Sequence, residues 1–263
     1  MSLGVSEWAP NSLNIFRNCD NNCRYCYAAQ QALDRHQIKS RDEWGLGMFP
    51  NKSWQSKPKR LDGRTMVPTT HDFFPKHLDE YIIPFLRGWL EAGNELLITT
   101  KPRYEVIKRI CEEFEKYKDK FVFRFTIGSI DDDFLRFWDN KAPGIIQRVT
   151  SLQYAFKHGF NTSISCEPYF DYELMRLIKL VSKYATDTIW IGKMNQIDHR
   201  VDMTNWTSKD YSFLEVRNIV QSDDYIKNKI YPLLKDNPKI RWKDSIKKVL
   251  GIERCKERLD KDG

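Results

Sequence analysis

Three cysteines lie within eight residues near the start of the chain: Cys19, Cys23 and Cys26, spaced C-x3-C-x2-C. Thiolates are soft ligands that suit zinc or an iron–sulfur cluster. An apolar, strand-like stretch at residues 13–16 precedes them, and a helix-prone stretch at 27–37 follows. A cubane cluster held by three cysteines leaves one iron open, so this spacing predicts a metal site that can bind a reactant.

Two other interpretations of these cysteines stay open. They could be unliganded core residues, although the polar residues at 20–22 and 24 interleave them. They could also form a structural zinc site together with His36, although the second ligand pair of a zinc finger or ribbon is missing.

The cysteine motif resembles the cluster loop of radical S-adenosylmethionine (SAM) enzymes, with Tyr25 as the aromatic residue before the last cysteine. The longer string from Ser12 to Ala28 is similar to the branch that contains spore photoproduct lyase. The resemblance covers residues 12–195 and implies a 4Fe-4S cluster on the three cysteines. It further implies a flavodoxin- or ferredoxin-type electron donor and reductive cleavage of SAM to methionine and a 5′-deoxyadenosyl radical. That radical abstracts hydrogen from a substrate.

The composition limits the other classes. The chain has 263 residues, 41% of them hydrophobic, which is enough for one large α/β domain or a domain with a small appendage. No stretch approaches the ~18 apolar residues of a membrane span, and the first residues do not read as a signal peptide. The remaining cysteines, Cys111, Cys166 and Cys255, are scattered, so we expect a cytoplasmic protein rather than a disulfide framework.

The chain is basic, with 43 Lys and Arg against 36 Asp and Glu, a net charge of +7. Such a balance favours polyanions as partners, nucleic acid first, although a merely soluble basic enzyme has the same composition. The segment 41–63 combines basic and aromatic residues that suit a nucleic-acid backbone and its bases: Trp44, Lys52, Trp54, Lys57, Lys59 and Arg60. We expect this segment and the basic C-terminal helices to form two walls of a groove, with a solvated insertion as the alternative.

From residue 64 the chain alternates between strands and helices, which calls for a parallel sheet. Six strands are expected, at 13–16, 65–67, 95–100, 121–127, 161–165 and 188–191. The helices are expected at 75–92 with a bend at Pro84, 104–117, 133–138, 145–158 and 172–184. The resemblance implies a partial (β/α)6 TIM-like barrel, whereas periodicity alone equally allows a doubly wound sheet. After Met203 we expect helices only, at 213–220, 225–234 and 245–259, as a C-terminal extension (201–263) to a barrel domain (1–200).

Polar residues end the strands, and functional residues of such folds gather at the carboxyl ends of parallel strands. The candidates for binding SAM are Thr70, Asp72, Lys101, Arg124, Ser129, Glu167 and Asn195. The resemblance gives Lys101, which closes a Thr-Lys strand end, a contact with the methionyl carboxylate. It also assigns a SAM contact to Ser129 and places Tyr25 close to the adenine. Ordinary capping of strand ends is the alternative for each residue.

The chain departs from the family pattern at the second strand. Radical SAM enzymes commonly have Gly-Gly-Glu there, whereas Thr70-His71-Asp72 looks like the Ser-Asp-Pro variant of the lyase branch. Spore photoproduct lyase places a hydrogen-donor cysteine just before that segment, where this chain has Pro68 and Thr69. Cys166, after the fifth strand, is the other thiol expected at the barrel mouth, as a catalytic radical relay or as core packing.

These features predict a radical SAM enzyme, a lyase or modifying enzyme, that acts on a nucleic acid or nucleotide. A peptide or small metabolite is the alternative substrate. A zinc-bearing RNA-binding module without catalysis is the alternative from another class.

Overall fold

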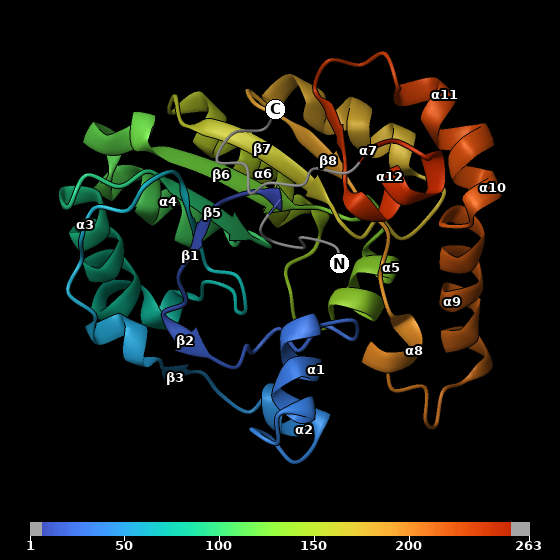
Figure 1. The fold of residues 1–263 in the computed structure, drawn as a ribbon, viewed down its shortest axis with the longest axis horizontal. Coiled ribbons are helices and arrows are strands. Elements are labelled where there is room, and N and C mark those ends of the chain that lie inside the picture. Colours follow the sequence, from blue (N-terminus) through green and yellow to red (C-terminus); the bar gives the residue numbers. More distant parts are fainter. Residues whose placement is uncertain (1–6, 254–263) are drawn as a thin grey trace.

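The molecule is built on a curled sheet of parallel strands (Figure 1). The structure is a computed structural model that describes residues 7–253. Within these residues seven strands form one sheet in the order β1-β4-β5-β6-β7-β8-β9, and every neighbouring pair is parallel. Because the order along the sheet follows the order along the chain, the sheet lacks the reversal of a doubly wound fold. The predicted partial TIM-like barrel is confirmed.

The strands are longest in the middle of the sheet. They are β1 (Asn11–Ser12), β4 (Thr65–Val67), β5 (Leu96–Thr100), β6 (Phe121–Thr126), β7 (Asn161–Cys166), β8 (Ile189–Ile191) and β9 (Ile240–Trp242). A separate antiparallel pair joins β2 (Phe16–Arg17) to β3 (Phe49–Pro50).

Helices line the outer face and the carboxyl edge of the sheet (Figure 1). They are α1 (Tyr27–Asp34), α2 (Arg41–Trp44), α3 (Ile83–Glu91), α4 (Tyr104–Glu113), α5 (Asp132–Asp139), α6 (Ile145–Lys157), α7 (Leu174–Val181), α8 (Ile197–Arg200), α9 (Ser208–Val220), α10 (Asp223–Tyr225), α11 (Tyr231–Leu234) and α12 (Asp244–Leu250). Single π turns, Leu78–Ile82 and Ile226–Ile230, precede α3 and α11. The bend predicted at Pro84 is thus a π turn that ends just before the proline.

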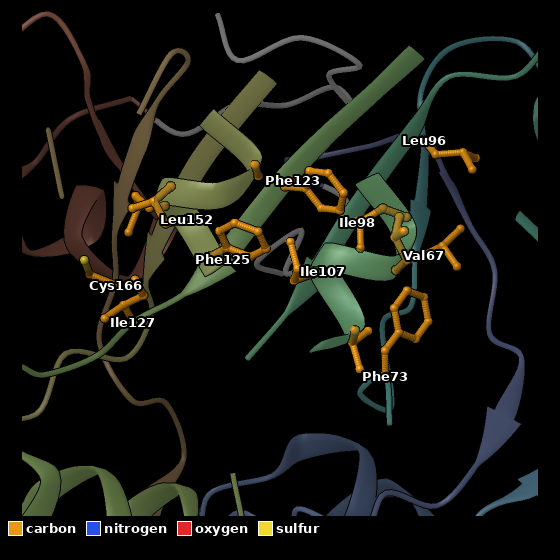
Figure 2. Close-up of a cluster of buried hydrophobic side chains, with 14 of the residues drawn as sticks. Val67, Phe73, Leu96, Ile98, Ile107, Phe123, Phe125, Ile127, Leu152 and Cys166 are labelled. Carbon is orange, nitrogen blue, oxygen red and sulfur yellow. The ribbon is translucent and has the colours of Figure 1, made fainter. Parts of the chain in front are cut away.

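The main core lies between the sheet and the outer helices. Along β6, Phe121, Phe123 and Phe125 point to this side and are fully buried. Figure 2 shows Phe123 and Phe125 close to Ile107 of α4 and Leu152 of α6. Burial of one such ring stabilises the fold by about 1.5–3 kcal/mol. The run of apolar residues on alternate strand positions therefore fixes which face of the sheet the helices cover.

The alternate residues of β6 face the inside of the half-barrel. Arg124 is fully buried there, and its guanidinium carbon lies 4.7 Å from the ring centroid of Trp8 and 5.4 Å from that of Trp190. Its Nε donates to Ser163 Oγ at 3.0 Å. These contacts fill the floor of the half-barrel around Arg124.

The prediction that strands end before Met203 is wrong. β9 pairs with β8, with Ile240 opposite Ile189 and Trp242 opposite Ile191. The strand is only three residues long and has a charged residue, Arg241, at its centre, so its alternation is too short to be distinguished from a loop. The three helices predicted after Met203 correspond to α9, to α10–α11 and to α12. The part of the last predicted helix beyond residue 253, with Cys255, lies outside the described residues. The domain boundary at residue 201 stays a prediction.

The prediction of a strand at 13–16 is wrong: β1 covers Asn11–Ser12, and Phe16 belongs to the antiparallel pair of β2 and β3. Side chains take up several backbone groups of the segment in between. The amides of Ile15 and Phe16 donate to His71 Nε2 at 3.1 and 3.2 Å. Nε2 is therefore the acceptor, and Nδ1–H donates to the carbonyl of Asp72 at 3.0 Å. Asn14 Oδ1 accepts from the amides of Thr69 and Thr70. The segment 13–16 is thus bound to the end of β4 by one backbone hydrogen bond, from the amide of Leu13 to the carbonyl of Met66 at 3.0 Å, and otherwise through the side chains of Asn14 and His71.

The buried His71 should make stability depend on pH. Burial lowers its pKa from 6.5 to about 4, so between these values the unfolded chain binds the extra proton. The stabilisation is complete above pH 6.5 and is lost as the pH falls through about 4. Between pH 7 and pH 5 the loss should be roughly 2 kcal/mol. Urea unfolding at both pH values should show this loss in the native protein and not in His71→Gln; equal losses in both would contradict it.

Candidate active site

The three cysteines lie on a loop between β2 and α1, and all three line one cavity of about 910 Å³. Asn18 and Asn22 have φ of 65° and 46°, left-handed values that asparagine tolerates better than most residues. The amide of Cys26 donates to the carbonyl of Cys23 at 3.1 Å, and Cys26 is the N-cap of α1. Local turn chemistry therefore turns the thiols towards the same space.

Arg41, from α2, holds this loop from outside. Its Nη2 donates to the carbonyls of Cys23 at 2.9 Å and Arg24 at 3.3 Å, and its Nη1 donates to that of Cys26 at 3.3 Å. A planar guanidinium with five donors suits several carbonyls of one turn. Sequence reasoning missed this residue because it lies 15 positions beyond the motif, in a segment without clear periodicity.

Asp72 ties the cysteine loop to two strand ends. It accepts from Asn21 Nδ2 at 2.8 Å, from the amides of Phe73 and Lys101 at 3.0 and 3.1 Å, and from Thr100 Oγ1. Asp72 lines the cavity as predicted, but its oxygens are already bonded to the protein. Its position indicates that it orders the loop and the end of β5.

Lys101 and Tyr25 meet at the cysteine end of the cavity. Lys101 Nζ lies 5.6 Å from the Tyr25 ring centroid and 3.9 Å from Asp139 Oδ1. Burial opposes the charged form of this lysine, but Cys23, Tyr25, Asp139 and Asp72 outweigh it and raise its pKa well above the ordinary value. The ammonium is therefore charged and half-buried in the wall of the cavity.

Other predicted residues also line the cavity: Thr70, Glu167 and Asn195. Glu167 Oε2 lies 3.4 Å from Nζ of Lys243, a buried lysine that follows β9. Lys243 and Lys248 form part of the far wall, and sequence reasoning missed them because β9 itself was missed.

Three predicted site residues lie elsewhere. Arg124 lies at the floor of the half-barrel, as described above, and Ser129 Oγ is bonded to the buried Asp171. Cys166 is fully buried in the helix-covered core, beside Ile127 in Figure 2, and burial raises its pKa to about 12. None of the three lines the cavity. The geometry gives Cys166 the packing role that was its alternative.

The donor set fits an iron–sulfur cluster. Three cysteines supply one thiolate each to three irons of a cubane and leave the fourth open. Thr99 and Ser165 also line the cavity, and their buried hydroxyl oxygens have no protein partner in the described part of the chain. A bound ligand with hydroxyl or amine groups would satisfy them.

The zinc alternative does not fit the geometry. His36 is exposed and follows α1, whose eight residues span about 12 Å from Cys26. Among residues 7–253, no three His, Cys, Asp or Glu side chains, the three cysteines included, converge as the ligands of one metal ion do. The cysteines of a cubane each bind a separate iron, so a cluster does not require that convergence.

The predicted two-walled groove stays a prediction: Trp44 and Lys248, one from each predicted wall, line the cavity, whereas Lys52, Lys57, Lys59 and Arg60 do not. Asn94, just before β5, accepts from the amide of Leu61 and donates to the carbonyl of Lys59. These bonds place the last part of the basic segment, residues 59–61, at the amino end of the sheet. The C-terminal helices flank β9, at the opposite edge. Trp44 is buried and lines the cavity, and Trp54 packs on Tyr81.

In residues 7–253 no helix has the length and apolar character to cross a membrane.

Comparison with known proteins gives the fold. No protein-family model matches the chain. The uncharacterised protein ORF301 of Acidianus two-tailed virus is 23% identical over 179 residues, 62% of this chain and 56% of the viral protein, so the chain aligns with little more than half of that relative. A spore photoproduct lyase variant with dinucleoside spore photoproduct superposes with a TM-score of 0.51 at 14% identity, over 87% of this chain and 74% of the lyase.

A second solved structure is similar to the same extent. Streptococcus suis SuiB bound to precursor peptide SuiA gives a TM-score of 0.52 at 11% identity, over 96% of this chain and 55% of SuiB. At these identities the likeness concerns the fold. The fold that the resemblance implied is confirmed.

Proposed function

We propose that the protein is a radical SAM enzyme. The observation that carries the proposal is that Cys19, Cys23 and Cys26 line the same cavity as Lys101 and Tyr25, at the carboxyl edge of a half-barrel. The three thiolates would hold a 4Fe-4S cluster. When the cluster and SAM are both bound, the cluster would supply the electron that cleaves SAM to methionine and a 5′-deoxyadenosyl radical.

In this proposal the chain's own residues bind and orient SAM. The Lys101 ammonium would pair with the methionyl carboxylate, and the Tyr25 ring would contact the adenine. Thr70, Glu167 and Asn195 offer polar groups to the amine and the ribose, and so do Thr99 and Ser165.

For the substrate we propose a nucleic acid or nucleotide, with a peptide or small metabolite as the alternative. The net charge of +7 supports the first, as do the cations Lys193, Arg200 and Lys248 on the cavity wall.

An external one-electron donor of the flavodoxin or ferredoxin type is part of the proposal. The reducing cytoplasm is the compartment that suits the five free cysteines of the described part. Binding of single-stranded DNA or RNA that weakens as the salt concentration rises would support the nucleic-acid substrate. If neither binds at low salt, a peptide or small metabolite is the substrate to test.

The test of the proposed function is anaerobic reconstitution with iron and sulfide, followed by metal analysis and incubation with SAM and dithionite. We expect about four irons per chain and release of 5′-deoxyadenosine. Stoichiometric zinc without iron, and no cleavage of SAM, would point to the non-catalytic zinc module instead.

A further inference from the structure

A buried ion pair lies directly behind the candidate active site. Asp139 is the last residue of α5, and its carboxylate Oδ2 lies 2.7 Å from Nη2 of Arg148 on α6. The two side chains are 1% and 0% exposed. Arg148 is fixed in turn, because its Nε donates to the carbonyl of Pro143 at 2.7 Å and its Nη1 to that of Thr126 at 3.1 Å.

The other oxygen of Asp139 faces the site. Its Oδ1 accepts from the hydroxyl of Tyr25 and lies 3.9 Å from Lys101 Nζ. The backbone carbonyl of the same residue lies 3.5 Å from Cys23 Sγ. One residue outside the cavity lining therefore contacts three residues assigned to the site.

The pair with Lys101 leaves the ammonium available. At 3.9 Å the two groups attract each other but do not form a hydrogen bond. Within residues 7–253 no protein acceptor is hydrogen-bonded to Lys101 Nζ, so its three donors can go to a ligand carboxylate. A flexible lysine that is already held in place loses less rotamer freedom on binding.

We propose that Asp139 is a positioning residue for SAM: it holds the Lys101 ammonium and the Tyr25 ring in their binding orientation, and Arg148 holds its carboxylate. This inference rests on the proposed function. A buried ion pair is weak evidence for a gain in stability, because removing two charges from water offsets their attraction. Because Asp139 also contacts Tyr25 and Lys101, the ion pair serves to position these two residues rather than to stabilise the fold.

The first test is SAM binding by Asp139→Asn, measured by equilibrium dialysis on the reconstituted protein. The amide has the shape of the carboxylate but no charge, so we expect SAM to bind roughly 10- to 100-fold more weakly. Iron content should stay the same, and the change that SAM makes in the EPR spectrum of the reduced protein should shrink. Glu113→Gln is the matched control, since Glu113 pairs with Arg87 and Arg109 on the outer face and should leave binding unchanged.

A second readout does not need SAM. In the apo-protein, labelling of Lys101 by an amine-reactive ester, followed by mass spectrometry, should be several-fold faster in Asp139→Asn, because the side chain is no longer held. Tyr25→Phe keeps the ring and removes only its bond to Asp139, so it should weaken SAM binding even if Asp139→Asn folds poorly. Native affinity in both variants, or an unchanged labelling rate in Asp139→Asn, would overturn the inference. A native protein that binds neither iron nor SAM would overturn the proposed function, while the labelling result would still decide the role of Asp139.

Discussion

Cys23→Ala is expected to abolish iron binding and SAM cleavage while leaving the fold intact. One of three cluster thiolates disappears, and no other cysteine lines the cavity in the described part of the chain. The half-barrel has its own core on the opposite face of the sheet, so loss of one sulfur atom should cost only about 1–2 kcal/mol of stability. Iron analysis, 5′-deoxyadenosine release and urea unfolding together measure these effects.

The matched control for this variant is Cys111→Ala. Cys111 is buried on α4, packs in the core and lies outside the cavity lining, so its replacement should keep both iron and cleavage. If Cys23→Ala still releases 5′-deoxyadenosine with dithionite, the assignment of the cysteines is wrong.

Lys101→Met should weaken SAM binding by about 1.5–3 kcal/mol, the usual contribution of a hydrogen bond to a charged group. That is roughly a 10- to 160-fold rise in the dissociation constant. Methionine keeps most of the volume of the lysine stem, so the loss should reflect the ammonium rather than packing. Iron content should be unchanged, because Lys101 is not a predicted cluster ligand.

Lys239→Met is the control for the loss of a half-buried lysine. Lys239 donates to the carbonyls of Ser182 and Ala185 at 2.9 and 2.7 Å, away from the cavity, and its replacement should leave SAM affinity unchanged. If Lys101→Met also binds SAM with native affinity, Lys101 lies outside the binding site.

The sequence is most informative about the cysteine loop and the carboxyl ends of the strands. Parallel strands bring their ends to one edge, so Thr70, Lys101 and Glu167 could be assigned to one site before any coordinates. The position of a residue at a strand end does not show which face of the sheet its side chain lies on. Ser165 lines the cavity, whereas Cys166, one residue later, points to the helices, because successive side chains of a strand alternate.

The depth of a residue in the half-barrel was also not predictable. Arg124 pairs in register with Thr99, which lines the cavity, yet its own side chain lies at the floor against Trp8 and Trp190. Asp139 and Arg148 carry no motif. Their role depends on how α5 and α6 pack, which no local pattern encodes.

The contact between Glu7 and Lys243, at opposite ends of the described chain, has a consequence for how the protein folds. Lys243 Nζ lies 3.1 Å from Glu7 Oε1, and the amide of Asp244 donates to Glu7 Oε2 at 3.2 Å, across 237 positions. Contacts of such sequence separation close late, because the loop entropy is lost before the contact stabilises anything. During synthesis, the cysteine loop and the central strands can form early, while the far wall of the cavity must wait for β9. A nascent chain stalled before residue 240 should therefore hold the thiols in a half-barrel that is still open on one side.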